Sequence, residues 1–111
     1  MDFSQDLVKG SIVPVILALV RERPMYGYEM VKQVNARTGG RLEWREGTLY
    51  PALHKLEQEG WIAAEWKTTE NNRKAKFYSL TRLGRKQLES ETAQWKRLSS
   101  AISHVIQITE V

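Results

Sequence analysis

The first apolar segment of the chain predicts a buried helix. Residues 12–20 form a nearly continuous apolar run, which is too short to span a bilayer and contains Pro14. Ser11 can cap a helix here, and Pro14 is tolerated near its start because the first amides of a helix have no acceptor within it. We therefore expect a helix from Ser11 to about Arg23, or one kinked at Pro14 if residues 5–10 are also helical.

A second helix is predicted where apolar residues recur at spacings of three and four. The residues with this spacing are Met30, Val31 and Val34. Such a spacing places side chains on one face of a helix. We expect this helix to open at Tyr26-Gly27, after Pro24, and to end at Gly39-Gly40. A short connector over residues 41–46 then leads to the next segment.

The third segment, from Gly47 to about Glu57, has two faces of different character. On a helical wheel one face carries Leu49, Ala52, Leu53 and Leu56, and the other carries Gly47, Tyr50, Pro51, His54, Lys55 and Gln58. The second face has no carboxylate, since Glu57 and Glu59 lie on its flanks, and this suits nucleic acid. A solvated amphipathic helix whose Tyr50 packs on a neighbour has the same pattern, so the surroundings must decide between the two interpretations.

After Gly60 the pattern changes to one that is typical of strands. Aromatic, β-branched and alternating residues fill 61–69 and 75–81, and Asn71-Asn72 between them suits the positive φ of a hairpin turn. Arg73, Lys74 and Lys76 place positive charge at the tip of this hairpin. Three helices followed by a charged hairpin is the order of a winged helix-turn-helix, a mainly α (α+β) fold with a two-stranded β wing.

The last segment predicts a long helix with an apolar seam. Thr81 can cap it, and it continues to about Ile108 with one glycine, Gly84, which costs about 1 kcal/mol relative to alanine. The residues of the seam are Leu88, Trp95, Leu98, Ile102 and Val105. No later element can cover such a seam, so we expect the same helix of a second copy to do so. Residues 1–81 would then be the DNA-binding domain and residues 82–111 the dimerisation helix.

Composition narrows the possible functions. The chain has 111 residues, the size of one domain, and a net charge of +4, which weakly favours an anionic partner. It has no cysteine, and neither His54 nor His104 has an acid or nucleophile at a spacing that suggests a triad. We expect no catalytic residue, no metal site and no cofactor. Asp2 and Asp6 stand where a secretory signal would carry positive charge, so we expect a cytoplasmic protein without a membrane partner.

Three segments together resemble the PadR family of winged helix transcriptional regulators, over nearly the whole chain. They are Tyr26-Gly27-Tyr28-Glu29, which is similar to the opening of that family's second helix; Gly47-Thr48-Leu49-Tyr50-Pro51-Ala52-Leu53 with Leu56-Glu57 and Gly60, which is similar to its recognition helix; and Arg73 through Leu80-Thr81, which is similar to its wing. The Thr-Leu-Tyr-Pro segment is fairly specific.

The resemblance implies properties that composition and spacing do not show. It implies a repressor of a nearby promoter, released by a small phenolic, drug-like or other signal molecule. The short C-terminal end is similar to the smaller subfamily, in which one long helix provides the dimer contact. Ala75 departs from the family pattern, because it stands where an arginine is expected to bind phosphate.

The candidate DNA-contacting residues lie on the third helix and the hairpin. They are Gly47, Thr48, Tyr50, Pro51, His54 and Lys55, with Arg73, Lys74 and Lys76 as phosphate contacts. A lone histidine such as His54 is often only solvated, but the order of the helices favours contact with a base. A winged helix that binds another protein is the alternative, and it should bind DNA weakly and with little sequence preference.

Trp95 is the candidate ligand-binding residue. It lies near the middle of the last helix among small or polar neighbours, so two copies would leave a gap that suits a planar aromatic effector. Two indoles that simply pack against each other or on the core would fit the same position. The other tryptophans, Trp44, Trp61 and Trp66, are expected in core and hairpin packing.

Overall fold

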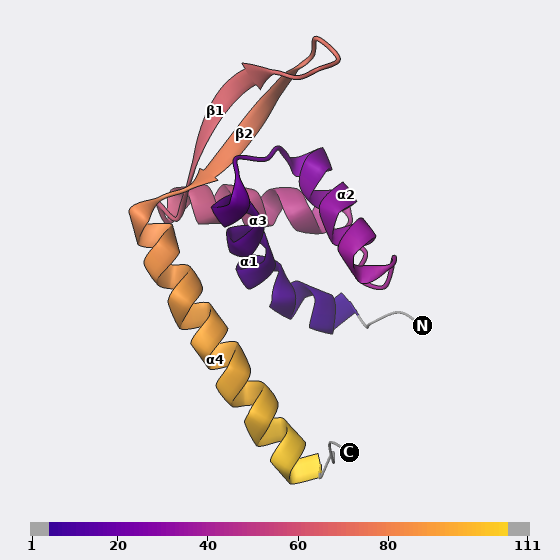
Figure 1. Cartoon of the computed structure of the whole chain (residues 1–111), viewed down its shortest axis with the longest axis vertical. Coiled ribbons are helices and arrows are strands. Elements are labelled where there is room, and N and C mark those ends of the chain that lie inside the picture. The colour runs from indigo at the N-terminus through magenta and orange to yellow at the C-terminus, as the bar shows by residue number, and fades with distance from the viewer. Residues whose placement is uncertain (1–4, 107–111) are drawn as a thin grey trace.

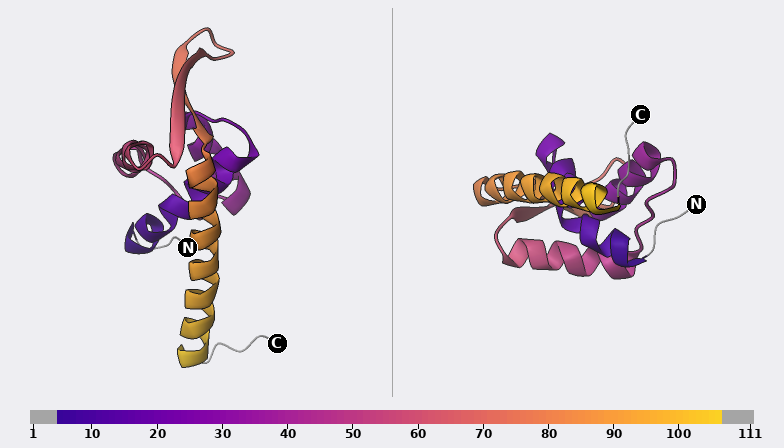
Figure 2. Two further views of the ribbon diagram at one scale, coloured as in Figure 1. Left: turned by 90° about the vertical axis from the view of Figure 1, so that its left-hand side faces the viewer. Right: turned by 90° about the horizontal axis from the view of Figure 1, so that it is seen from below.

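The computed structural model describes residues 5–106 of the chain, with side chains from residue 8 onward. The elements are α1 (Gln5–Glu22), α2 (Gly27–Thr38), α3 (Glu46–Gln58), β1 (Ile62–Thr68), β2 (Lys74–Leu80) and α4 (Arg82–Ile106). α1 lies between α3 and α4, and the hairpin and α4 extend in opposite directions from the three-helix body (Figures 1 and 2). This arrangement is the predicted winged helix-turn-helix.

The first helix begins earlier than a cap at Ser11 predicts. α1 is already helical at Gln5, and the Ser11 hydroxyl donates to the carbonyl of Val8 at 2.8 Å, one turn back within the helix. Val8 is buried with the core, which explains why the helix continues toward the N-terminus. Ser11 is therefore an interior residue and not a cap. The alternative with residues 5–10 helical holds, and Pro14 lies inside α1.

The boundaries of α2 and α3 follow the local signals. α2 opens after Tyr26 and ends at Gly39, whose φ of 62° is in the left-handed region that glycine adopts without strain. The connector to α3 buries Trp44 in the core, as predicted. α3 begins at Glu46, one residue before the predicted start, and its apolar face forms the centre of the core.

The hairpin forms where the two strands were predicted, as an antiparallel pair. β1 and β2 pair from Ile62 opposite Leu80 to Thr68 opposite Lys74. Asn72 takes a φ of 61°, which confirms the turn predicted at the asparagine pair. At its base, Met25 and Tyr78 exchange two backbone hydrogen bonds of 3.0 and 2.8 Å. The wing is thus anchored to the link between α1 and α2.

The last helix is capped as predicted and is attached to the body at one end only. The Thr81 hydroxyl accepts a hydrogen bond from the Gly84 amide at 2.9 Å, which is the geometry of an N-cap. The predicted end near Ile108 lies outside the described residues. Leu88 is 3% exposed and packs in the core of its own chain, unlike the rest of the predicted seam. In the part of the chain that the structure describes, no helix is long and apolar enough to cross a membrane.

Candidate nucleic-acid interface

α3 presents the face that the helical wheel predicted. Leu49, Leu53 and Leu56 are fully buried against the body. The opposite face is exposed, and its residues are Gly47, Tyr50, Pro51, His54, Lys55 and Gln58. Thr48 and Ala52 are half-buried at the border between the two faces. The exposed side of α3 therefore offers a phenol, an imidazole and an ammonium group without a carboxylate among them.

Tyr50 is both packed and accessible. A Cβ atom added to Gly27 would lie 3.0 Å from Cε1 and 3.1 Å from the hydroxyl oxygen of Tyr50, so the ring lies against the first residue of α2. The side chain is nevertheless 47% exposed. The missing side chain at Gly27 thus lets the ring and hydroxyl of Tyr50 lie on α2 while about half of the residue remains exposed.

The three cations predicted at the wing tip have two different environments. Arg73 and Lys74 are exposed, at the end of the turn and the start of β2, and neither forms an ion pair with any described residue. Lys76 lies closer to the body, where its ammonium is 3.0 Å from Oε1 of Glu57. The hydrogen bond that the Lys76 ammonium donates to Glu57 is the main cause that raises the pKa of Lys76. Of these three cations, Arg73 and Lys74 can meet phosphate without breaking an ion pair with a described residue.

A cleft of about 350 Å³ separates the wing from α2 and α3. Its walls are Tyr26, Gly27, Tyr28, Tyr50, Trp66, Lys74, Ala75, Lys76 and Tyr78. Trp66 is 66% exposed, so the prediction that it packs in the hairpin or core was wrong. It lies opposite Lys76 in the strand register, beyond the part of the wing that the body covers. Strand alternation predicts the face of Trp66 but not where the core ends.

Nothing in the described part of the chain is arranged for acid–base chemistry. The buried polar atoms among the described residues include Nε1 of Trp44, Oε1 of Glu29 and the phenol oxygen of Tyr78, whose pKa is raised by burial. No group of three or more metal-ligating side chains occurs among the described residues either. The interface can hold a partner by shape, charge and hydrogen bonds.

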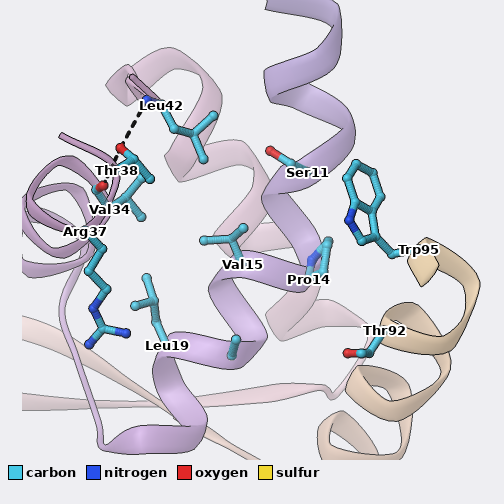
Figure 3. A pocket seen from close by; sticks show the side chains of 11 residues that line it. Ser11, Pro14, Val15, Leu19, Val34, Arg37, Thr38, Leu42, Thr92 and Trp95 are labelled. Carbon is cyan, nitrogen blue, oxygen red and sulfur yellow. Dashed lines mark hydrogen bonds between the residues drawn. The ribbon is translucent and has the colours of Figure 1, made fainter. Parts of the chain in front are cut away.

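A second hollow, lined in part by Trp95, lies between the helical body and the middle of α4. It has a volume of about 380 Å³ and lies between α1, the end of α2 and α4 (Figure 3). Its lining is mostly apolar: Ser11, Pro14, Val15, Ala18, Leu19, Val34, Arg37, Thr38, Leu42, Thr92 and Trp95. The indole extends from α4 toward Ser11 and Pro14. Sequence reasoning predicted Trp95 as a ligand-binding residue but missed that α1 and α2 of the same chain supply the other walls.

The outer part of α4 exposes a row of apolar side chains. Leu98, Ile102, Val105 and Ile106 are all exposed, and Trp95 is 51% exposed at the inner end of this row. They are the residues of the predicted seam with two differences: Leu88 is buried in the core of its own chain, and Ile106 is exposed beside the others.

A family model and a similar solved structure name the same family. The model of the transcriptional regulator PadR-like family matches residues 16–90. A protein from Lysinibacillus sphaericus is 30% identical over 97 residues, which cover 87% of this chain and 89% of that protein. A transcriptional regulator from Clostridium thermocellum superposes with a TM-score of 0.83 at 28% identity, over 90% of this chain and 97% of the other. A PadR-like transcriptional regulator from Bacillus cereus gives 0.79 at 28% identity, over 95% and 100%.

Proposed function

We propose that this chain, which belongs to the PadR-like family of transcriptional regulators and is a DNA-binding protein rather than an enzyme, is a repressor. It binds an inverted repeat as a homodimer and is released by a small aromatic effector.

The exposed face of α3 beside the free cations of the wing is the observation that supports specific DNA binding. We assign base contacts in the major groove to the exposed or bordering residues Gly47, Thr48, Tyr50, Pro51, His54 and Lys55. Arg73 and Lys74 would contact phosphate, which positions a protein without reading sequence. An ion-paired Lys76 fits that role less well than its two neighbours do.

The apolar row on α4 supports the homodimer. Trp95, Leu98, Ile102 and Val105 would pack against the same residues of a second copy around a two-fold axis. Two recognition helices related in this way would enter successive major grooves, roughly 34–36 Å apart, so the operator should be an inverted repeat.

Selection of duplexes from a randomised pool, followed by titration, tests this function. The selected sequences should contain an inverted repeat, and scrambling one half-site should weaken binding by at least about a hundredfold at fixed salt. The protein should also bind the DNA upstream of its own coding region if it regulates a nearby promoter. Weak binding to all duplexes alike would contradict the proposal and favour a winged helix that binds proteins.

The hollow beside Trp95 supports an effector site. It is large enough for a small planar molecule, and its walls come mainly from α1, the end of α2 and α4. α1 also packs against α3, so a ligand that changes how α4 lies on α1 acts on a neighbour of the recognition helix. Release requires that the ligand prefer a dimer geometry that no longer matches successive grooves, because equal affinity for both geometries shifts nothing.

Trp95→Ala is the test of this site. Planar aromatic compounds would be titrated against the protein with and without its operator, and DNA release and tryptophan fluorescence would be followed together. The exposed Trp66 would be replaced by Phe in every sample to lower the background. At concentrations at which sedimentation shows Trp95→Ala to be dimeric, we expect this variant to bind the operator and to lose the response to an active compound. A response that survives this substitution would locate the effector site elsewhere.

A further inference from the structure

Lys76 and Glu57 join the wing to the recognition helix. The four ion pairs among the described residues are Arg23–Glu29, Arg37–Glu22, Lys67–Glu65 and Lys76–Glu57. The first two join the region of α1 to α2, and the third lies within β1. Lys76–Glu57 alone, within that set, connects β2 to α3.

The strand register brings this pair together. Tyr78 is buried, and because side chains alternate along a strand, Lys76 lies on the same face of the wing, two residues closer to the tip. Its ammonium lies 3.0 Å from Oε1 of Glu57 and 5.7 Å from the centre of the Tyr78 ring. The Lys76 and Glu57 side chains are 35% and 34% exposed. Lys76 therefore has two partners within its own chain on the side that faces the helices.

On its other face the wing is supported by Tyr26, whose ring meets that of Phe77 edge to face with the centroids 5.1 Å apart, so the Lys76–Glu57 pair is a second side-chain support near this height. The base of the wing is held by the backbone hydrogen bonds between Met25 and Tyr78, and these are two residues closer to the body than Lys76. A two-stranded hairpin is only marginally stable by itself, so its angle to the body depends on such contacts. The Lys76–Glu57 pair is placed where it can resist rotation of the wing about that base.

We propose that Glu57 and Lys76 form a brace that sets the angle of the wing relative to α3, and that Lys76 is a positioning residue rather than a phosphate contact. The inference rests on the proposed function, because the brace matters only if α3 reads bases while the wing tip contacts phosphate. The pair has no net charge, so it adds little to counterion release on DNA. Its effect should instead be on the ratio of the affinity for operator DNA to the affinity for non-operator DNA.

Four variants test the brace: Glu57→Gln, Lys76→Gln, the double variant and Lys76→Arg. The two single Gln variants should each lower the ratio of operator to scrambled-duplex affinity, by up to about fivefold as expected for an exposed ion pair. The double variant should be no worse than either single one, since both remove the same contact. Lys76→Arg keeps the pair and should retain the ratio of the unchanged protein.

Lys74→Gln is the matched control, because Lys74 lies on the same strand and forms no described ion pair. It should lower the slope of log affinity against log salt by about one unit, whereas Lys76→Gln should leave that slope unchanged. A slope lowered by Lys76→Gln with an unchanged affinity ratio would overturn the brace. So would a Glu57→Gln variant that binds all duplexes more tightly and keeps the ratio.

A measurement without DNA separates failure of the brace from failure of the proposed function. Backbone NMR order parameters for residues 69–74 should fall in Glu57→Gln and Lys76→Gln and stay unchanged in Lys74→Gln. Unchanged order parameters in all three would overturn the brace whatever the DNA does. Lowered order parameters in a protein that does not discriminate between duplexes would support the brace and contradict the proposed function.

Discussion

At Gly84, α4 passes close to the backbone of Trp61, in the link between α3 and β1. A Cβ atom at this position would lie 1.9 Å from the backbone oxygen of Trp61 and 2.8 Å from Cδ1 of Leu80. Helix propensity alone counts a glycine here as a cost of about 1 kcal/mol. At this position the close approach makes glycine more favourable than alanine, because a backbone oxygen cannot move aside as a flexible side chain can.

We therefore expect Gly84→Ala to lower the free energy of unfolding, by about 1–3 kcal/mol as for other overpacked sites. Urea unfolding followed by circular dichroism measures this change. Gly10→Ala is the matched control, since Gly10 lies within α1 and an added Cβ would meet nothing within 4 Å. The control should gain about 0.5–1 kcal/mol of stability. Equal gains in both variants would show that α4 can move away from Trp61 without cost.

At the scale of elements, α3 and the wing tip carry different chemical groups, so substitutions in them should change DNA binding in different ways. Changing Arg73 or Lys74 to Ala should weaken binding to all duplexes alike and lower the salt slope by about one unit each. Changing Tyr50 or His54 to Ala should mainly reduce discrimination between operator and scrambled DNA, because base contacts and not phosphate contacts carry sequence information. Titrations at four or more salt concentrations separate the two effects. An Arg73→Ala variant with altered sequence preference and an unchanged salt slope would reverse the assignment.

α1 and α2 are joined at their ends by an ion pair whose strength depends on pH. The Arg37 guanidinium donates two hydrogen bonds of 2.6 Å to the Glu22 carboxylate, and these lower the pKa of Glu22 below its ordinary value of 4.5. A carboxylate with a lowered pKa in the folded state stabilises the fold above its unfolded pKa. That contribution is lost as the pH falls through the folded pKa.

Removing the carboxylate should therefore change the pH dependence of stability. We expect Glu22→Gln to be less stable than the unchanged protein at pH 7, and the difference in urea midpoint to shrink as the pH falls below 4.5. The pair is exposed, so the difference should be small. Glu89→Gln is the control, because Glu89 is exposed and forms no ion pair with any described residue. A difference that grows toward acid pH would show that Arg37 does not stabilise the Glu22 carboxylate.

At the scale of the whole molecule, α4 extends away from the body with its outer apolar residues uncovered (Figures 1 and 2). Sedimentation at micromolar concentration should show a mass near twice 12.9 kDa. Ile102→Glu should raise the dimer dissociation constant by at least about thirtyfold, because a two-fold interface would bury the new carboxylate twice. Ser100→Glu on the opposite side of α4 is the control and should remain dimeric. A folded monomer of the unchanged protein at this concentration would contradict the dimer.

Local patterns were sufficient to predict the order of the elements, the two faces of α3 and the turn at Asn72. The reason is that helix and strand periodicities, caps and turn residues act over a few neighbouring positions. They do not specify which element covers a given face. Only the folded chain showed that Leu88 belongs to the core of its own chain and that Trp66 lies beyond the core.

The same limit applies to pairs of residues that are distant in the sequence. Glu57 and Lys76 are 19 positions apart, and Trp61 and Gly84 are further apart still, so no short-range spacing predicts their contacts. Trp95 was predicted as a ligand-binding residue, yet the walls it shares with α1 and α2 exist only once three helices are packed. Local periodicity assigns each side chain to a face of its own element. The packing of elements decides what that face contacts, because the distance between two elements cannot be read from the spacing of residues along either one.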